Sequence, residues 1–133
     1  MDQDNLNAGR FAGVLLAPNP IARILSDDGT YPNNARLPLL VYQAAVRLPQ
    51  ADPAATFEAL FRAHSWGGSW RNGVYGFHHY HSTAHEVLGL YQGRVKVVFG
   101  GPQGPIRTAE AGDVIIISCL RVSEFHITVN VIT

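Results

Sequence analysis

The 133-residue sequence contains a single cysteine, Cys119, so an intrachain disulfide is impossible. This absence excludes the small secreted domains that disulfides hold together. An excess of charge is also absent, because ten lysines and arginines balance ten aspartates and glutamates. Binding to nucleic-acid phosphates or to an anionic membrane surface needs clustered positive charge. The composition therefore argues against nucleic-acid and membrane partners.

Long apolar runs are missing too. No window reaches the roughly 18 consecutive apolar residues of a membrane-spanning helix. The segment Met1 to Arg10 is polar and acidic, and it lacks the basic start and apolar stretch of a signal peptide. We therefore expect a cytoplasmic protein. Hydrophobic residues make up 47% of the sequence, which is typical of a globular protein with one hydrophobic core.

Turn-forming residues dominate positions 18–38, where proline, asparagine, aspartate and glycine recur. This composition predicts an N-terminal arm over residues 1–36, laid over the core of a domain that spans residues 37–133. The apolar residues expected to anchor the arm are Ile21, Ile24, Leu25 and Leu37.

One helix is predicted, at about residues 53–64. Asp52 suits the N-cap position and Pro53 suits the first helical position. An apolar stripe at helical spacing follows, formed by Phe57, Leu60, Phe61 and His64. We expect His64 to be structural, because it closes this stripe.

The hydrophobic period changes to two from Trp70 onward, and glycines separate the segments. The predicted strands cover residues 39–48, 74–81, 87–91, 94–99, 106–110 and 114–117. Short antiparallel strands around one helix indicate an all-β barrel or sandwich, with the N-terminal arm as an extension.

Three residues in the histidine-rich segment are candidate metal ligands. Alternate side chains of a strand share a face, so His79 and His81 point the same way. A turn through residues 82–85 then brings Glu86 back on a neighbouring antiparallel strand. Two imidazoles and one carboxylate suit a divalent ion such as Fe, Mn, Zn, Ni or Cu. Such a site leaves coordination positions for water or substrate, which catalysis requires.

The stretch GVYGFHHYHSTAHEVLGLYQG resembles the first motif of the cupin superfamily. Its fixed positions are Gly73, His79, His81, Glu86 and Gly93, at the spacing of that motif. Residues 20–118 are also similar to a small family of single-domain cupins. The resemblance implies a double-stranded β-helix, which is an RmlC-like jelly-roll barrel, with a metal inside and commonly a homodimer. It does not fix a reaction, because cupins include dioxygenases, isomerases, decarboxylases and non-enzymatic proteins.

The second cupin motif begins at Gly112 and Asp113, but the match stops after residue 118 and Ser123 occupies its histidine position. We therefore expect a jelly roll that is incomplete at its C-terminus. Three explanations remain open. The C-terminus is altered by a frameshift or an unspliced intron, or the protein is divergent and His126 replaces the missing ligand, or a partner chain completes the barrel.

Aromatic residues near the motif are candidates for lining a small-ligand pocket, and core packing is their alternative role. They are Tyr75, Phe77, Tyr91 and Phe99. His85 either orients the neighbouring Glu86 or is a solvated turn residue. Nothing near Cys119 in the sequence indicates a nucleophile.

The functional hypothesis is a metal-dependent enzyme, an oxygenase or isomerase, acting on a small organic molecule. The alternatives are a non-catalytic cupin that binds a small ligand or a metal, and an inactive truncated product. The sequence assigns no separate catalytic acid or base, and it does not identify the metal.

Overall fold

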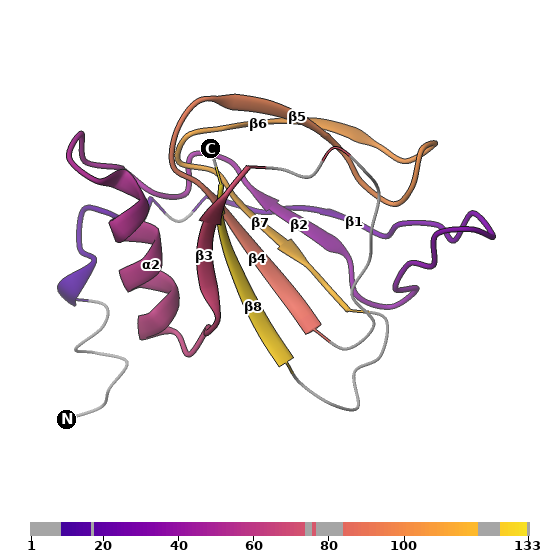
Figure 1. The fold of residues 1–133 in the computed structure, drawn as a ribbon, viewed down its shortest axis with the longest axis horizontal. Helices are drawn as coiled ribbons and strands as arrows, with labels where there is room; N and C mark the ends of the chain where they lie inside the picture. The colour runs from indigo at the N-terminus through magenta and orange to yellow at the C-terminus, as the bar shows by residue number, and fades with distance from the viewer. Residues whose placement is uncertain (1–8, 17, 74–75, 77–83, 120–125, 133) are drawn as a thin grey trace.

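The computed structural model describes residues 9–16, 18–73, 76, 84–119 and 126–132, the last of these ranges by its backbone. Its regular structure is mainly β, with eight strands in two sheets and the helix α2 among the described residues (Figure 1). The predicted all-β class is therefore confirmed.

The larger sheet has six strands in the order β1-β2-β7-β4-β8-β3. Their bounds are β1 Ile21–Arg23, β2 Leu39–Tyr42, β3 Ser69–Asn72, β4 Ala84–Leu90, β7 Val114–Ile117 and β8 His126–Ile132. The pairs β1–β2, β2–β7 and β7–β4 are antiparallel. The pairs β4–β8 and β8–β3 are parallel, whereas only antiparallel pairs were predicted. Strands β3 and β4 run in the same direction. The strand between them, β8, is therefore either parallel to both or antiparallel to both, and it is parallel.

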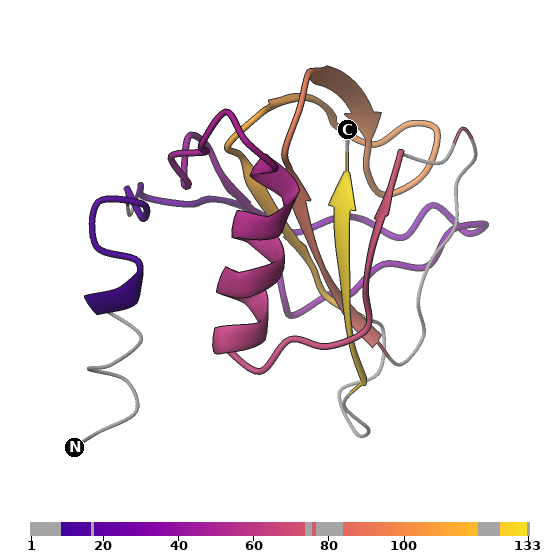
Figure 2. The same ribbon diagram turned by 60° about the vertical axis from the view of Figure 1, so that its left-hand side comes forward.

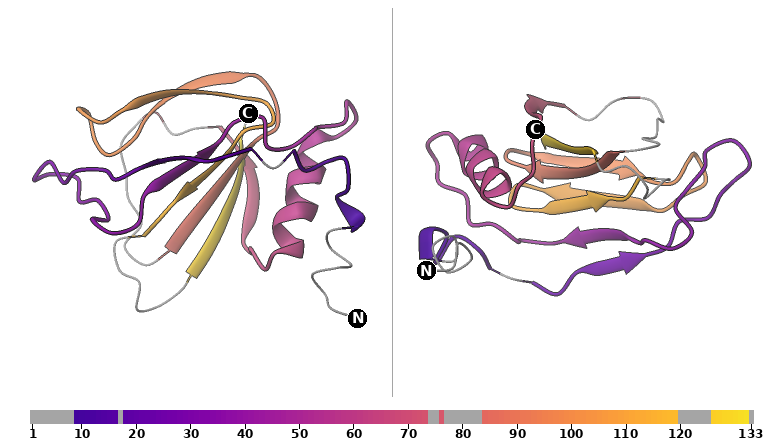
Figure 3. Two further views of the ribbon diagram at one scale, coloured as in Figure 1. Left: turned by 180° about the vertical axis from the view of Figure 1, so that it is seen from behind. Right: turned by 90° about the horizontal axis from the view of Figure 1, so that it is seen from below.

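The smaller sheet is an antiparallel hairpin of β5, Arg94–Val98, and β6, Ile106–Glu110. It lies across one face of the six-stranded sheet (Figures 1 and 3). Apolar side chains from both sheets fill the space between the two layers, which we call the inner core. Its buried members are Leu39, Val41, Leu88, Leu90, Phe99, Ala109 and Ile115. Within the described residues the strands form two layers and do not close into a barrel.

Helix α2, Pro53–Ala63, packs on the opposite face of the larger sheet (Figure 2). Its buried face consists of Ala54, Phe57, Leu60 and Phe61. The apolar stripe predicted the last three of these, whereas its fourth member, His64, is the exposed C-cap residue. Asp52 is the N-cap residue and Pro53 begins the helix, as predicted, but Asp52 adopts a left-handed conformation and its side chain makes no capping hydrogen bond. Its carboxylate instead lies 3.0 Å from the guanidinium of Arg71 on β3. Hydrogen bonds to Glu58 and then to Asp52 raise the pKa of Arg71, so these two carboxylates tie the helix to β3.

The predicted strand at 39–48 is too long, because β2 ends at Tyr42 and a turn follows. Ala44 has a φ of 48°, which interrupts the extended backbone, and its N–H donates to Asp113 Oδ1 at 2.8 Å. Val46 then forms an isolated bridge with Leu15. The predicted segments at 87–91, 94–99, 106–110 and 114–117 correspond to β4, β5, β6 and β7.

The N-terminal arm supplies β1, which extends the larger sheet beside β2. Two of its predicted anchors, Ile21 and Leu25, pack against the inner core. The other two, Ile24 and Leu37, are 49% and 37% exposed, so that part of the prediction is wrong. Their apolar character alone could not show which side of the arm faces the sheet. In the part of the chain that the structure describes, no helix has the length and apolar character needed to cross a membrane.

Candidate metal and ligand site

Glu86 is the predicted metal ligand that the structure describes, and it lies in the middle of the larger sheet on β4. Side chains alternate along a strand, so Glu86 shares a face with Leu88 and Leu90. Both leucines belong to the inner core, whereas Val87 packs on the side of α2. Glu86 is 5% exposed. Glu86 is therefore a buried carboxylate on the face of β4 that contributes Leu88 and Leu90 to the inner core.

The strands on both sides of β4 fix the position of Glu86. It stands opposite Ile117 of β7 in the antiparallel register and opposite Thr128 of β8 in the parallel register. Ile117 also packs against the inner core. The carboxylate thus adjoins an apolar layer, where an ion is stable only with compensating hydrogen bonds or an opposite charge.

Two glycines of the cupin-like motifs, Gly93 and Gly112, lie in the turns that hold the C-terminal end of β4. Gly93 lies between β4 and β5 with a φ of 77°, a conformation that glycine adopts without steric cost. Its carbonyl accepts a hydrogen bond from Ala111 N–H at 3.0 Å. Gly112 N–H donates to the Leu90 carbonyl at 2.8 Å, which joins the end of β4 to the turn before β7.

Asp113 is a buried carboxylate whose role is structural. Its Oδ1 accepts from Ala44 N–H at 2.8 Å and its Oδ2 accepts from Glu110 N–H at 2.9 Å. It thereby connects the turn after β2 with the end of β6. The sequence predicted a turn at Gly112 and Asp113. It did not predict the hydrogen bond to Ala44, because Ala44 is distant in the chain and no local pattern links the two residues.

Four of the predicted site residues lie outside the described residues: His79, His81, Tyr75 and Phe77. The three-ligand set thus stays a prediction in which Glu86 is the described member. Among the described residues, no three histidine, cysteine, aspartate or glutamate side chains gather closely enough to hold a metal ion. His126 begins β8 and pairs with Ala84, two positions from Glu86 along β4, so its backbone lies at the same end of the strand.

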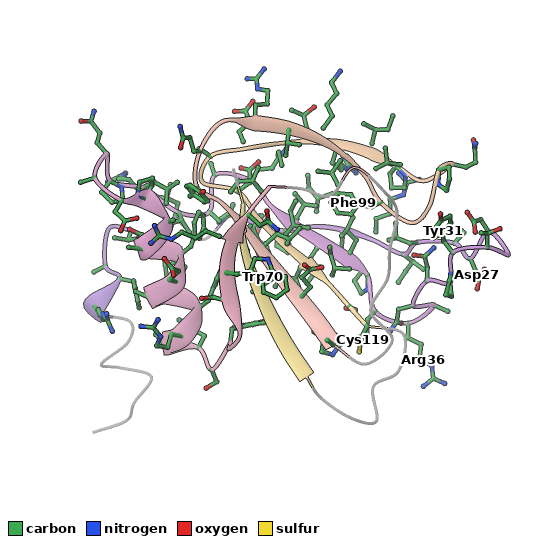
Figure 4. All side chains as sticks on the ribbon, viewed as in Figure 1. Asp27, Tyr31, Arg36, Trp70, Phe99 and Cys119 are labelled. Atoms are coloured by element: carbon green, nitrogen blue, oxygen red, sulfur yellow. The ribbon has the colours of Figure 1, made fainter. Side chains whose placement is uncertain are left out.

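His85 and Cys119 form a contact that the sequence did not predict. Cys119 N–H donates to His85 Nδ1 at 3.0 Å, and Cys119 Sγ lies 3.9 Å from Nε2. Because Nδ1 accepts, a neutral imidazole in this position carries its proton on Nε2, on the side of the sulfur. Asn34 donates to the Cys119 carbonyl at 2.7 Å, and Cys119, two residues after β7, is 2% exposed (Figure 4).

These contacts exclude one of the two roles considered for His85. It is a partly buried residue of β4, not a solvated turn residue. The alternative, that His85 helps to orient Glu86, stays a prediction. The two side chains belong to opposite faces of β4 by strand alternation, so any such effect acts through the backbone.

The two described aromatic candidates do not share a pocket. Phe99 is buried in the inner core, between the hairpin and the larger sheet (Figure 4). Tyr91 packs against the cluster on the helix side of the sheet. Phe99 is therefore the aromatic candidate that lies in the same layer as Glu86.

Comparison with curated proteins identifies a relative from a bacterium. The chain is 36% identical over 91 residues to the "Uncharacterized protein YjlB" of Bacillus subtilis (strain 168). The alignment covers 68% of this chain and 52% of the relative, so the chain spans about half the length of the curated relative that it matches. No profile of a known protein family matches the chain. No solved structure matches it either.

Proposed function

We propose that this chain is a cupin-type domain that binds a divalent first-row metal through His79, His81 and Glu86. In this proposal it is a metal-dependent oxygenase or isomerase that acts on a small organic molecule. The observation that carries the proposal is the position of Glu86, 5% exposed on the inner face of β4. The cupin-like motif places a metal ligand at this residue.

The surroundings of Glu86 favour this role over that of a surface acid. Leu88 and Leu90 follow it on the same strand face, and Ile117 stands opposite it. Transferring a charged carboxylate into such a layer costs several kcal/mol unless hydrogen bonds or a cation compensate. A carboxylate oxygen is a ligand that Fe, Mn, Zn and Ni all accept, so a buried carboxylate at this position is compatible with a bound divalent ion.

Two further features support the cupin-type architecture. The motif's final glycine, Gly93, occupies a turn with a φ of 77° between β4 and β5. The hairpin β5–β6 lies across one face of the sheet that carries Glu86, so the strands form two layers. A jelly roll is also built of two packed sheets, and this likeness supports the proposal.

A metal bound at Glu86 would act as a Lewis acid toward oxygen atoms of the substrate. Glu86 would contribute one negative charge, and His79 and His81 would contribute neutral nitrogen ligands. The inner core would exclude water and contact apolar parts of a small molecule, with Phe99 as its aromatic member. We also propose homodimerisation, on the basis of the cupin resemblance alone.

Metal analysis of the purified protein tests the proposal. We expect a stoichiometric first-row metal in the wild type, and its loss in Glu86→Gln and in the double variant His79→Ala/His81→Ala. The matched controls are Glu110→Gln, which alters an exposed glutamate on β6, and His64→Ala, at the end of α2. Absence of metal from the wild type under every metal supplementation tried would refute the proposal.

Oxygen consumption then separates an enzyme from a binding protein. Diketones, thiols and catechols form the substrate panel, and isomerisation is followed by the spectra of the products. Turnover that depends on Glu86 but not on Glu110 supports catalysis. Metal binding without turnover of any substrate supports the non-catalytic alternative.

A further inference from the structure

The end of strand β3 brings a side-chain amide next to the following backbone nitrogen. Asn72 is the last residue of β3, and Gly73 N–H donates a hydrogen bond to Asn72 Oδ1 at 2.9 Å. This bond folds the Asn72 side chain over the next peptide group. The carbon Cγ, one bond away from Oδ1, therefore lies beside the Gly73 nitrogen.

Access to this pair of atoms is open. Asn72 and Gly73 are both exposed, and β3 is an edge strand of the larger sheet. A Cβ added at Gly73 would meet no atom of the described residues within 4 Å, and Gly73 does not adopt the left-handed conformation. Neither burial nor crowding by these residues shields the Gly73 nitrogen.

We propose that Asn72–Gly73 is a site of spontaneous deamidation. The Gly73 nitrogen attacks Asn72 Cγ and forms a C–N bond while losing its proton. The bond from Cγ to Nδ2 breaks, ammonia leaves with the proton, and a five-membered succinimide remains. Water then opens the ring at Cγ, which gives aspartate, or at the main-chain carbonyl, which gives isoaspartate. The sequence is a hydrolysis overall and needs no oxidant, reductant or enzyme.

Asp28–Gly29 has the same potential for succinimide formation but a different geometry. Asp28 Oδ1 accepts from the N–H groups of Thr30 and Tyr31, at 2.9 and 2.6 Å. Gly29 N–H donates instead to Asp27 Oδ1 at 2.8 Å. The Asp28 carboxylate is therefore bound by the backbone N–H groups of Thr30 and Tyr31. We expect Asn72 to be the more reactive of the two residues.

Deamidation would change the charge and the backbone at the edge of the sheet. The new carboxylate would adjoin Arg71, which already pairs with Asp52 and Glu58. An isoaspartate would also insert a methylene into the main chain where Asn72 pairs with Ile132 of β8. We expect the modified chain to be more acidic and its β3–β8 pairing to be weakened at this end.

Ageing of the folded full-length chain at mildly alkaline pH tests the proposal. Peptide mapping by mass spectrometry should show a gain of about 1 Da at Asn72, with both aspartate and isoaspartate products. Gly73→Ala is the matched control, because a methyl group there crowds the attacking nitrogen without meeting described atoms. It should slow the reaction several-fold, and Asn72→Gln should prevent it. Circular dichroism checks that each variant is folded.

Two results would overturn the proposal. One is an unmodified Asn72 in the folded wild type under conditions that deamidate the same chain in urea. The other is a folded Gly73→Ala variant that deamidates as fast as the wild type. The comparison of folded and urea-unfolded wild type decides the matter without any variant.

Discussion

At Gly89 the larger sheet and helix α2 approach so closely that no side chain fits between them. A Cβ at Gly89 would lie 2.6 Å from Phe57 Cδ1, and the Phe57 side chain is completely buried. We expect Gly89→Ala to lower the free energy of unfolding by about 1–3 kcal/mol, because overpacking forces the ring or the strand to shift. Urea denaturation measures the change.

The control for this substitution is Gly67→Ala. An added Cβ there meets no described atom within 4 Å, and the residue is not left-handed. Its effect should stay within about 0.5 kcal/mol. Equal stabilities of the two variants would show that β4 and α2 are not in close contact.

Asp113 should contribute strongly to stability, because its side chain connects the turn after β2 with the end of β6. Its carboxylate accepts two backbone N–H groups, from Ala44 and Glu110. We expect Asp113→Ala to cost about 2–4 kcal/mol, because it leaves both donors unpaired. Asp113→Asn keeps one acceptor oxygen and should cost less, as judged by denaturation midpoints. An alanine variant as stable as the wild type would contradict the structural role.

At the scale of elements, the β5–β6 hairpin should depend on its apolar face and not on its ion pair. Arg94 and Glu110 pair across the strands, but their side chains are 70% and 53% exposed. A double-mutant cycle should give a coupling below about 1 kcal/mol. Phe99→Ala should cost about 3–5 kcal/mol, because it removes a ring from the inner core. A coupling energy of the ion pair that exceeds the stability lost in Phe99→Ala would contradict this expectation.

The elements that the sequence predicted are those with a strong local pattern. Helix α2 and strands β4 to β7 follow from hydrophobic period and from glycine turns at their ends. The errors occurred where distant residues decide the conformation. Asp52 is the N-cap residue of α2, as predicted, yet its carboxylate pairs with Arg71 of β3 and does not cap the helix. Residues 39–48 look like one strand, yet the Asp113 side chain holds a turn at Ala44.

At the scale of the whole molecule, the topology contains the feature least visible in the sequence. Strand β8 lies parallel to both of its neighbours, β4 and β3. The direction of a strand in a sheet depends on the connection that leads to it and on partners distant in the chain, so the residues of the segment do not fix it alone. The contact between His85 and Cys119 was unpredictable for a related reason, since it joins strand β4 to the segment after β7 across 34 positions.

Part of the environment of the candidate residues was predictable. The motif singled out Glu86 as a candidate ligand, and Glu86 is 5% exposed on the face of β4 that it shares with Leu88 and Leu90 of the inner core. Its role as a metal ligand stays a prediction. Phe99 follows β5 into the same core, whereas Tyr91 lies on the other side of the sheet. The period of two could not separate these aromatics, because the intervening turn at Gly93 changes the alternation.

We propose that Glu86 holds a divalent metal together with His79 and His81. Titration of the chelator-treated protein with Mn(II) or Zn(II), followed by isothermal calorimetry, tests it most directly. We predict one ion per chain for the wild type and for Glu110→Gln, and at least about tenfold weaker binding for Glu86→Gln. Equal affinity of the wild type and Glu86→Gln, or no binding to the wild type, would contradict the account.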